Sequence, residues 1–337
     1  MRFFVRSLAV AIPALILASC EDISFGDSDR YKEDFHYSYN VKAGGRLALE
    51  SFNGSVEIAG TGGNSVEING TKYANTESAL KDLKVDVQQS GDEVRVRLVP
   101  PYGSPRNMGG RFSVRVPREF ILDRIVTSNG SVRVEDVDGP ATLKSSNGSL
   151  RVARLKGNLD ATTSNSSIET SDLVGNALLH TSNGHVNVEV RNGSLDATTS
   201  NSSITARLLD PPDKPVRLQS SNGHIDFQTN VVRDVRADTS NSSITLRLPP
   251  NPNARLRART TNSSISTEPD LTIKGTQSKN SWEGTFGSGG PLLDLSTSNG
   301  SIKILRMYFS SEWDSPAAGR RRSGCGRVPF STFRRRV

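Results

Sequence analysis

Side chains that could perform acid–base chemistry or bind a metal are few in this sequence. Asp160 and Asp196 occupy equivalent positions in two repeats of the chain, and so do His185 and His224. Paired carboxylates can cleave a glycosidic bond, and paired histidines can bind zinc. In both pairs one repeat intervenes, which separates the two side chains by roughly 9–10 Å if the repeats are stacked strands. Neither aspartate has an evident acid partner, so we expect solvated side chains, no metal site and no cofactor.

A cysteine near the N-terminus carries the clearest chemical signal. An apolar run over residues 8–17 follows two arginines, and Leu17-Ala18-Ser19-Cys20 closes it. Such a run is typical of a secretory signal peptide and is too short for a permanent membrane span. Its ending resembles the lipobox of bacterial lipoproteins, in which small residues fit the signal peptidase and the cysteine thiolate takes up a lipid through a thioether bond.

Lipidation of this cysteine would determine where the protein resides. We expect residues 1–19 to be a cleaved signal peptide and residues 20–34 to be the lipidated cysteine with a short polar tether. The acyl chains on Cys20 would hold the protein on a membrane of the cell envelope, on the periplasmic side or at the cell surface. The only other cysteine is Cys325, so we expect neither a disulfide bond nor a zinc site built from cysteines.

A short polar phrase recurs along the rest of the chain at intervals of 18 to 21 residues. It reads as two hydroxyl residues, asparagine, glycine or serine, a polar residue and an aliphatic residue, as in residues 127–132. A period of this length is typical of a solenoid. The asparagines of the phrase are Asn129, Asn147, Asn165, Asn183, Asn201, Asn222, Asn241, Asn262 and Asn299, with an early copy at Asn53 and a degenerate copy at Asn280.

Between these asparagines, apolar and polar residues alternate with a period of two. Val132 and Val134 face one side of such a segment, and Ser131 and Arg133 face the other. This alternation predicts β-strands, and no helical pattern of useful length follows the signal peptide. We therefore expect an all-β protein, a single-stranded β-helix (β-solenoid) with coils of about 18 residues over residues 127–305.

The recurring asparagine has a structural role in this prediction. Asparagine tolerates left-handed backbone angles, so we expect it at a tight corner. Stacked in successive coils, the side-chain amides can hydrogen-bond along the axis as a ladder. The residue two positions earlier is always threonine or serine and faces inward by parity, so it needs partners among corner backbone groups and neighbouring hydroxyls. We expect the nine asparagines from Asn129 to Asn299 to form a structural corner ladder.

Both ends of the chain differ from the repeats. Residues 35–126 alternate less regularly and predict an N-terminal β portion that caps one end of the solenoid. Asn53 precedes Asn129 by about four periods, which suggests that the coil count continues through this portion. Residues 306–337 hold eight arginines and predict a disordered basic tail. Without the tail the net charge is close to zero, so we expect no nucleic-acid partner.

These motifs together resemble a known family. Residues 45–58, residues 112–117 and the repeated Ser-Asn-Gly-Ser-Val phrase look like a bacterial family of β-strand-repeat proteins, catalogued as a domain of unknown function and putative adhesin. The resemblance covers about residues 35–305. It implies an exported single-stranded β-helix and carries no catalytic residues over to this chain.

The sequence therefore favours a lipid-anchored β-solenoid of the cell envelope that acts as a non-catalytic structural or binding module of the adhesin type. Its expected partners are the membrane and an envelope polysaccharide or envelope protein. One alternative is a carbohydrate-active β-helix lyase or hydrolase, which would need a close pair of outward carboxylates in a groove. Another is a scaffold in the envelope-stress response, to which some members of the resembling family are linked.

Overall fold

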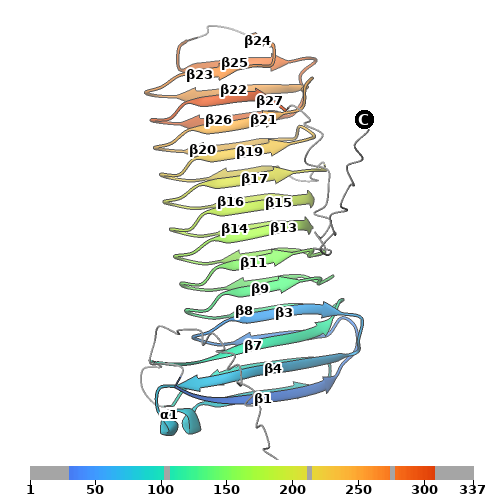
Figure 1. Cartoon of the computed structure of the whole chain (residues 1–337). Helices are drawn as coiled ribbons and strands as arrows, with labels where there is room; N and C mark the ends of the chain where they lie inside the picture. Colours follow the sequence, from blue (N-terminus) through green and yellow to red (C-terminus); the bar gives the residue numbers. More distant parts are fainter. Residues whose placement is uncertain (1–29, 102–106, 211–214, 274–277, 308–337) are drawn as a thin grey trace, which may run out of the picture.

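Two β-sheets face each other along the whole length of a rod (Figure 1). The computed structural model describes residues 30–101, 107–210, 215–273 and 278–307. Sheet A contains 13 strands and sheet B contains 14, which at a strand spacing of about 4.8 Å gives a rod roughly 60 Å long. The prediction of an all-β solenoid is confirmed.

The strands of each sheet follow one another in space from the N-terminal end of the rod to its C-terminal end. Sheet A comprises β1 (Tyr31–Asn40), β4 (Ser65–Ala74), β7 (Met108–Pro117), β3 (Val56–Thr61), β9 (Val132–Glu135), β11 (Leu150–Ala153), β13 (Ile168–Val174), β15 (Val186–Asn192), β17 (Ile204–Leu208), β19 (Ile225–Thr229), β21 (Ile244–Leu248), β27 (Ile302–Arg306) and β23 (Ile265–Thr267). Sheet B comprises β5 (Lys84–Ser90), β6 (Glu93–Val99), β2 (Arg46–Glu50), β8 (Ile121–Val126), β10 (Ala141–Lys144), β12 (Leu159–Thr162), β14 (Ala177–His180), β16 (Leu195–Thr198), β18 (Val216–Gln219), β20 (Val235–Thr239), β26 (Leu292–Thr297), β22 (Ala254–Thr260), β25 (Ser281–Phe286) and β24 (Leu271–Ile273).

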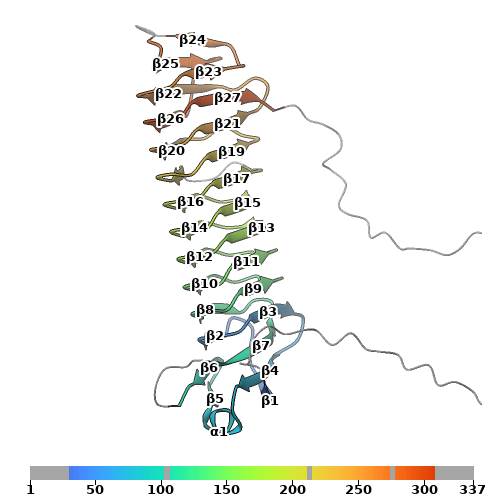
Figure 2. The ribbon, with the colours of Figure 1, turned by 60° about the vertical axis from the view of Figure 1, so that its left-hand side comes forward.

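Each regular coil contributes one strand to sheet B and the next strand to sheet A, as the rotated view shows (Figure 2). Parallel pairing places equivalent residues of successive coils side by side, so Val132, Leu150, Ile168 and Val186 form one row. All four are buried between the sheets. The core is therefore a thin layer of aliphatic side chains, and a two-residue alternation along each strand is enough to build it.

At the N-terminal end the spatial order of the coils departs from the chain order. Strand β3 pairs with β9 on one side and with β7 on the other, so the coil of Asn53 lies directly against the coil of Asn129. The interpretation that about four coils separate these asparagines is wrong. The intervening chain folds outside them instead, since β4 pairs antiparallel with β1 and β7, and β5 pairs antiparallel with β6.

A short helix, α1 (Glu77–Asp82), lies against β1 and β4 at this end of the rod. The Thr76 side chain caps its N-terminus by accepting a hydrogen bond from the backbone of Ala79. The ammonium group of Lys72 donates to the carbonyl oxygens of Leu80 and Leu83 at 3.3 and 3.1 Å, which satisfies groups that a helix end leaves unpaired. The described part of the chain holds no helix of the length and apolarity that a membrane span requires.

The C-terminal end is also interleaved. The last coil in the chain, β26 with β27, pairs with β20 and β21 on one side and with β22 and β23 on the other. Strand β25 then covers β22 in antiparallel orientation. The degenerate copy at Asn280 immediately precedes this antiparallel strand, so the interpretation of Asn280 as a worn coil corner is wrong.

Candidate functional site

Two predicted features lie outside the described residues. They are the signal peptide with Cys20, and the arginine-rich tail beyond residue 307. Lipidation of Cys20 therefore stays a prediction. Strand β1 begins at Tyr31, 11 residues after Cys20, and a chain of that length spans at most about 40 Å.

The nine predicted asparagines and Asn53 form one continuous chain of side-chain hydrogen bonds, which we call the corner ladder. At every step, the Nδ2 group of one asparagine donates to the Oδ1 atom of the asparagine in the neighbouring coil, at 2.6–2.8 Å. The spatial order is Asn53, Asn129, Asn147, Asn165, Asn183, Asn201, Asn222, Asn241, Asn299 and Asn262. None of these ten residues has a positive φ, so the expected left-handed conformation is wrong at this corner.

A buried threonine or serine lies two positions before each ladder asparagine. From Ser145 onward its hydroxyl donates to a corner carbonyl of the neighbouring coil, whereas Oγ of Ser51 has no hydrogen-bond partner. Thr181 accepts a hydrogen bond from the backbone N–H of Gly184 at 3.2 Å and donates to the carbonyl oxygen of Ser166 in the preceding coil at 3.0 Å. Ser145 does the same with Gly148 and Gly130, at 2.9 and 3.2 Å. In coils such as these two, where glycine follows the asparagine, the hydroxyl satisfies one corner donor and one corner acceptor that would otherwise be buried without a partner.

The residue after the ladder asparagine is glycine in the first two coils, Gly54 and Gly130, and from the third coil it alternates between glycine and serine in spatial order. From the third coil onward the residues are Gly148, Ser166, Gly184, Ser202, Gly223, Ser242, Gly300 and Ser263. A Cβ atom added to Gly184 would lie 1.6 Å from the carbonyl oxygen of Ser166. Glycine is therefore required in every second coil by the close approach of the neighbouring corner. In chain order Ser242 and Ser263 would be adjacent, and the inserted coil of Gly300 restores the alternation.

A second corner carries a shorter ladder that the sequence interpretation missed. Gly157, Gly175 and Gly193 have φ values of 157°, 141° and 142° in successive coils. The residues that follow these glycines are hydrogen-bonded between coils: Nδ2 of Asn176 donates to Oδ1 of Asn158 at 3.1 Å. The hydroxyl of Ser194 donates to Oδ1 of Asn176 at 2.8 Å. The signal in the sequence was a glycine that recurs in step with the asparagine phrase.

A third corner is held by ion pairs. Asp136, Arg154 and Asp172 have left-handed φ values of 59°, 54° and 54°. The guanidinium of Arg154 donates two hydrogen bonds of 2.8 Å to Asp136, and Arg191 donates one of 2.8 Å to Asp172. The hydrogen bond from Arg154 holds the pKa of the Asp136 carboxyl below its ordinary value. Such a carboxylate stays ionised, which suits a structural ion pair and not a general acid.

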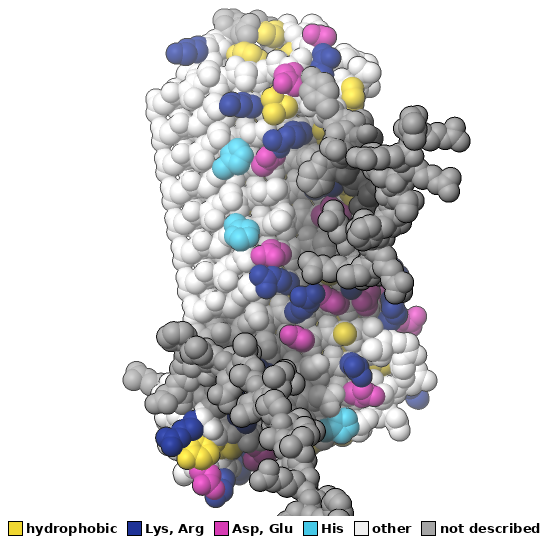
Figure 3. Space-filling model, viewed as in Figure 1, with side chains coloured by type: hydrophobic (Ala, Val, Ile, Leu, Met, Phe, Trp, Pro, Cys, Tyr) yellow, Lys and Arg dark blue, Asp and Glu magenta, His cyan; other side chains and the backbone are white. Residues whose placement is uncertain are grey.

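The outer face of sheet A carries charged side chains of both signs (Figure 3). Burial of Glu169 opposes its ionisation, but the hydrogen bond and the positive charge of Arg151 outweigh this effect and lower the pKa of Glu169. By contrast, the middle part of the border that lies left in Figure 3, where the strands of the regular coils of sheet A begin, shows no charged side chains among the described residues. This border is the corner of the asparagine ladder.

The structure keeps the residues of both candidate chemical pairs apart. Leu178 lies between Asp160 and Asp196 in the register of sheet B, so the carboxylates are two strand spacings apart, roughly 9–10 Å. His185 lies 3.7 Å from Glu169, and His224 hydrogen-bonds to Ser243 at 2.9 Å. Within the described ranges, no three His, Cys, Asp or Glu side chains are placed to hold a metal ion.

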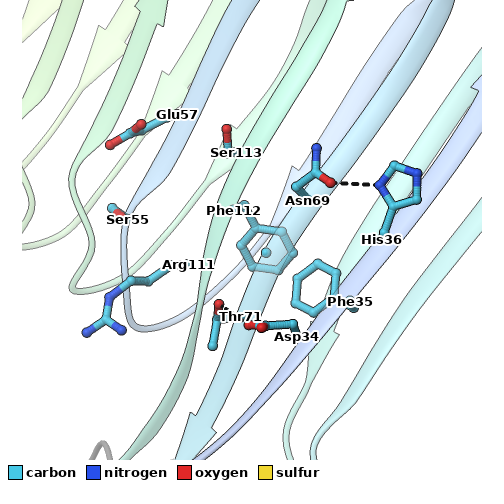
Figure 4. A pocket seen from close by; sticks show the side chains of 11 residues that line it. Asp34, Phe35, His36, Ser55, Glu57, Asn69, Thr71, Arg111, Phe112 and Ser113 are labelled. Atoms are coloured by element: carbon cyan, nitrogen blue, oxygen red, sulfur yellow. Dashed lines mark hydrogen bonds between the residues drawn. The ribbon is translucent and has the colours of Figure 1, made fainter.

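A groove of about 620 Å³ crosses the outer face of sheet A near the N-terminal end (Figure 4). We call it the cap groove. Strands β1, β4 and β7 each contribute two polar side chains, and β3 contributes one together with the residue just before it. The strand pairing aligns these side chains in two rows across the sheet. One row contains His36, Asn69, Ser113 and Glu57, and the other contains Asp34, Thr71, Arg111 and Ser55.

Between these rows lie Phe35, Gly70 and Phe112, which pair with one another across the three strands. The two aromatic rings are 5.3 Å apart and pack against the core. A Cβ atom at Gly70 would lie 2.3 Å from the Phe35 ring, so glycine allows the ring to cover the backbone there. The backbone of these three residues forms the floor of the cap groove, whereas the two rings lie on the core side of the sheet.

Hydrogen bonds hold several of the polar groups in place. The hydroxyl of Thr71 donates to Asp34 at 2.6 Å, and Nδ1 of His36 lies 2.7 Å from Oδ1 of Asn69. The guanidinium of Arg111 lies 4.9 Å from the centre of the Tyr73 ring, a cation–π contact. Three strand spacings, about 14 Å, separate Asp34 from Glu57, whereas the carboxyl pairs of glycosidases are at most about 9.5 Å apart.

The sequence interpretation missed the cap groove. Its residues come from four strands that are not consecutive in the chain, and their adjacency depends on the antiparallel pairing of β4 with β1 and β7. The only signal in the sequence was the alternation of polar residues within each strand, which marks an outer face without saying which strands are neighbours.

A family model and several solved structures match this chain. A search of the curated proteins finds no match to the chain. One similar solved structure is a putative cell adhesion protein from Clostridium sporogenes, with 11% identity and a TM-score of 0.21, covering 82% of this chain and 100% of that one. Another is a putative adhesin from Bacteroides fragilis, with 12% identity and a TM-score of 0.23, covering 82% of this chain and 97% of that one. The model of the Toastrack DUF4097 family matches residues 45–305, which confirms the resemblance inferred from the sequence motifs, and the chain belongs to this family.

Proposed function

We propose that this protein is a lipid-anchored, non-catalytic rod of the bacterial cell envelope that binds an extended envelope polysaccharide along the outer face of sheet A. The straight rows of outward side chains on that sheet carry the proposal. One row consists of Glu57, Arg133, Arg151, Glu169, Asn187, Thr205 and Asp226, which follow one another in parallel register.

A row of this kind repeats its polar contacts at every coil, about 4.8 Å apart. A linear polymer laid parallel to the rod axis can therefore contact many coils at once. Each contact is weak, but the contacts act together because binding at one coil raises the effective concentration at the next. A rigid rod held at one end by a lipid would present this track to polymers of the envelope.

Two observations support a role without catalysis. The carboxyls of Asp136 and Glu169 both have a pKa below the ordinary value, whereas a general acid that works near neutral pH needs it raised. Asp34 and Glu57 share a groove but are too far apart to act on one glycosidic bond. Glu135 and Asp136 do lie close together, but both are bound to the guanidinium of Arg154 at 3.5 and 2.8 Å, an arrangement that suits a structural ion pair.

Co-sedimentation of the full-length lipoprotein with purified insoluble envelope polysaccharide tests the proposal. Replacing Arg133 and Arg151 by glutamine removes two adjacent charges from the row, and we expect it to reduce the bound fraction severalfold. Arg217→Gln with Arg236→Gln makes the same change on sheet B, where these residues are also neighbours in register, and should bind like the wild type. Equal losses in both double variants, or no binding by the wild type, would contradict the proposed track.

The lipid anchor is tested separately. Wild-type protein should incorporate radiolabelled palmitate and partition with membranes, whereas Cys20→Ala should do neither because it lacks the thiol that forms the thioether bond. The absence of label from the wild type would rule out the anchor without affecting the polysaccharide track.

A further inference from the structure

We propose that the cap groove is a saccharide-binding site for a neutral or amine-bearing oligosaccharide. This inference rests on the proposed function and deepens it, because the groove continues the rows of sheet A. Glu57 pairs in register with Arg133 of the first regular coil, so the row that contains His36, Asn69 and Ser113 runs directly into the polysaccharide track.

The groove differs from the rest of the track in how its polar groups are arranged. Elsewhere on sheet A carboxylates are bound to cationic side chains, as Glu169 is to Arg151 and Glu33 is to Lys72. In the groove, Asp34 is held by the neutral hydroxyl of Thr71, and Glu57 makes no ion pair within the described ranges. Both carboxylates can therefore accept hydrogen bonds from ligand hydroxyl or amine groups. Carboxylates are strong acceptors, since charge-assisted hydrogen bonds are roughly twice as strong as neutral ones.

The neutral polar side chains of the groove can form further hydrogen bonds with the hydroxyl groups of a sugar. Asn69, Ser113 and Ser55 offer donors and acceptors in two parallel rows. His36 contacts Asn69 and thereby fixes the orientation of that amide. Phe35 and Phe112 pack against the core on the opposite side of the sheet, so the surface that a pyranose ring would meet between the rows is the backbone of the strands. A concave site with a few convergent polar groups is typical of small-molecule binding.

Charge in the groove selects among saccharides. Asp34 and Glu57 provide two negative charges, and Arg111 provides one positive charge whose guanidinium lies over the Tyr73 ring. A polyanionic saccharide would therefore meet net repulsion, while a neutral or amine-bearing one would not. The length of the groove, three strand spacings or about 14 Å, fits a short oligosaccharide.

Calorimetric titration of the full-length protein with three tetrasaccharides tests the inference. The probes are the tetramers of N-acetylglucosamine, glucosamine and galacturonic acid. We expect the first two to bind and the anionic tetramer to bind at least tenfold more weakly. Glu57→Gln and Asp34→Asn should each weaken the amine-bearing tetramer about tenfold, the loss expected when one hydrogen bond to a charged group is removed.

Glu67→Gln is the matched control. Glu67 belongs to β4, pairs with Arg115 at 3.6 Å and does not line the groove, so this variant should bind within twofold of the wild type. Thermal melts of all three variants establish that they are folded. Equal binding of all three tetramers, or unchanged binding in folded Glu57→Gln and Asp34→Asn, would overturn the inference.

The two proposals fail in different ways. If the wild type sediments with polysaccharide but binds no tetramer, the groove inference is wrong and the track on sheet A stands. If the neutral and amine-bearing tetramers bind, the groove variants lose that binding and the polysaccharide does not sediment the protein, the groove inference stands and the track is wrong.

Discussion

The side-chain amide of Asn299 donates a hydrogen bond of 2.8 Å to Asn241, although the two residues are 58 positions apart in the chain. Asn262, which is much closer to Asn241 in sequence, donates to Asn299 instead. The last coil of the chain therefore lies between two coils that precede it. The same interleaving occurs at the other end, where Asn129 donates to Asn53 across 76 positions. Both ends of the rod are closed by contacts that are long-range in sequence.

Truncation at residue 291 should damage more than the coil that it removes. Strands β22 and β23 reach β20 and β21 only through β26 and β27 in the order of the two sheets. Deleting β26 and β27 therefore leaves β22 and β23 without their parallel partners, and the solenoid should end at β21. We expect hydrogen exchange to show loss of protection in β22 and β23 with normal protection up to β19. Full protection of β22 in the truncated protein would contradict this topology.

Asn201→Ala should destabilise the solenoid by roughly 1–2 kcal/mol. The substitution removes two ladder hydrogen bonds, the one that Asn201 donates to Asn183 and the one that it accepts from Asn222. Each coil of a solenoid interacts mainly with its nearest neighbours, so protection from hydrogen exchange should fall most in the coils of those two asparagines. Lys144→Ala, at an exposed position of β10, is the control and should change stability by less than about 0.5 kcal/mol. Equal melting temperatures for both variants would show that the ladder contributes no stability.

Gly184→Ala should be much more harmful than Ser202→Ala at the equivalent position of the next coil. The new Cβ atom would lie 1.6 Å from the carbonyl oxygen of Ser166, and that oxygen is held by the hydroxyl of Thr181. The neighbouring corner would have to shift, at a cost of about 2–3 kcal/mol. Ser202 already carries a Cβ atom, so its truncation should cost less than about 0.5 kcal/mol. Denaturant unfolding of both variants measures the difference, and similar midpoints would refute the requirement for glycine.

The repeats predicted the solenoid because each phrase carries its own corner and its own alternation, so register follows from local sequence. They did not predict which coils are neighbours at the ends. The phrases at Asn262 and Asn299 carry the same corner asparagine, and only the strand pairing places the last coil between β20 and β22. The cap groove was hidden for the same reason, because Asp34 and Arg111 meet only through β4.

Thr170 and Thr181 provide a paired test of what a buried hydroxyl contributes in this fold. Both side chains are buried. Thr181 has a donor and an acceptor among the corner backbone groups, whereas Oγ1 of Thr170 has no hydrogen-bond partner. Thr170 lies in the core row between Val152 and Val188, where its hydroxyl is desolvated without compensation.

Replacing each threonine by valine keeps nearly the same shape, so the two changes should have opposite signs. Thr170→Val removes an unsatisfied polar group from an aliphatic row, and we expect it to stabilise the protein by about 1 kcal/mol. Thr181→Val leaves the N–H of Gly184 and the carbonyl of Ser166 without their shared partner, and we expect a loss of about 1–3 kcal/mol. Equilibrium unfolding of both variants decides the question. Destabilisation by Thr170→Val would mean that the Thr170 hydroxyl has a hydrogen-bond partner in solution. The core row would then accommodate a polar side chain for a reason other than the packing of its neighbours.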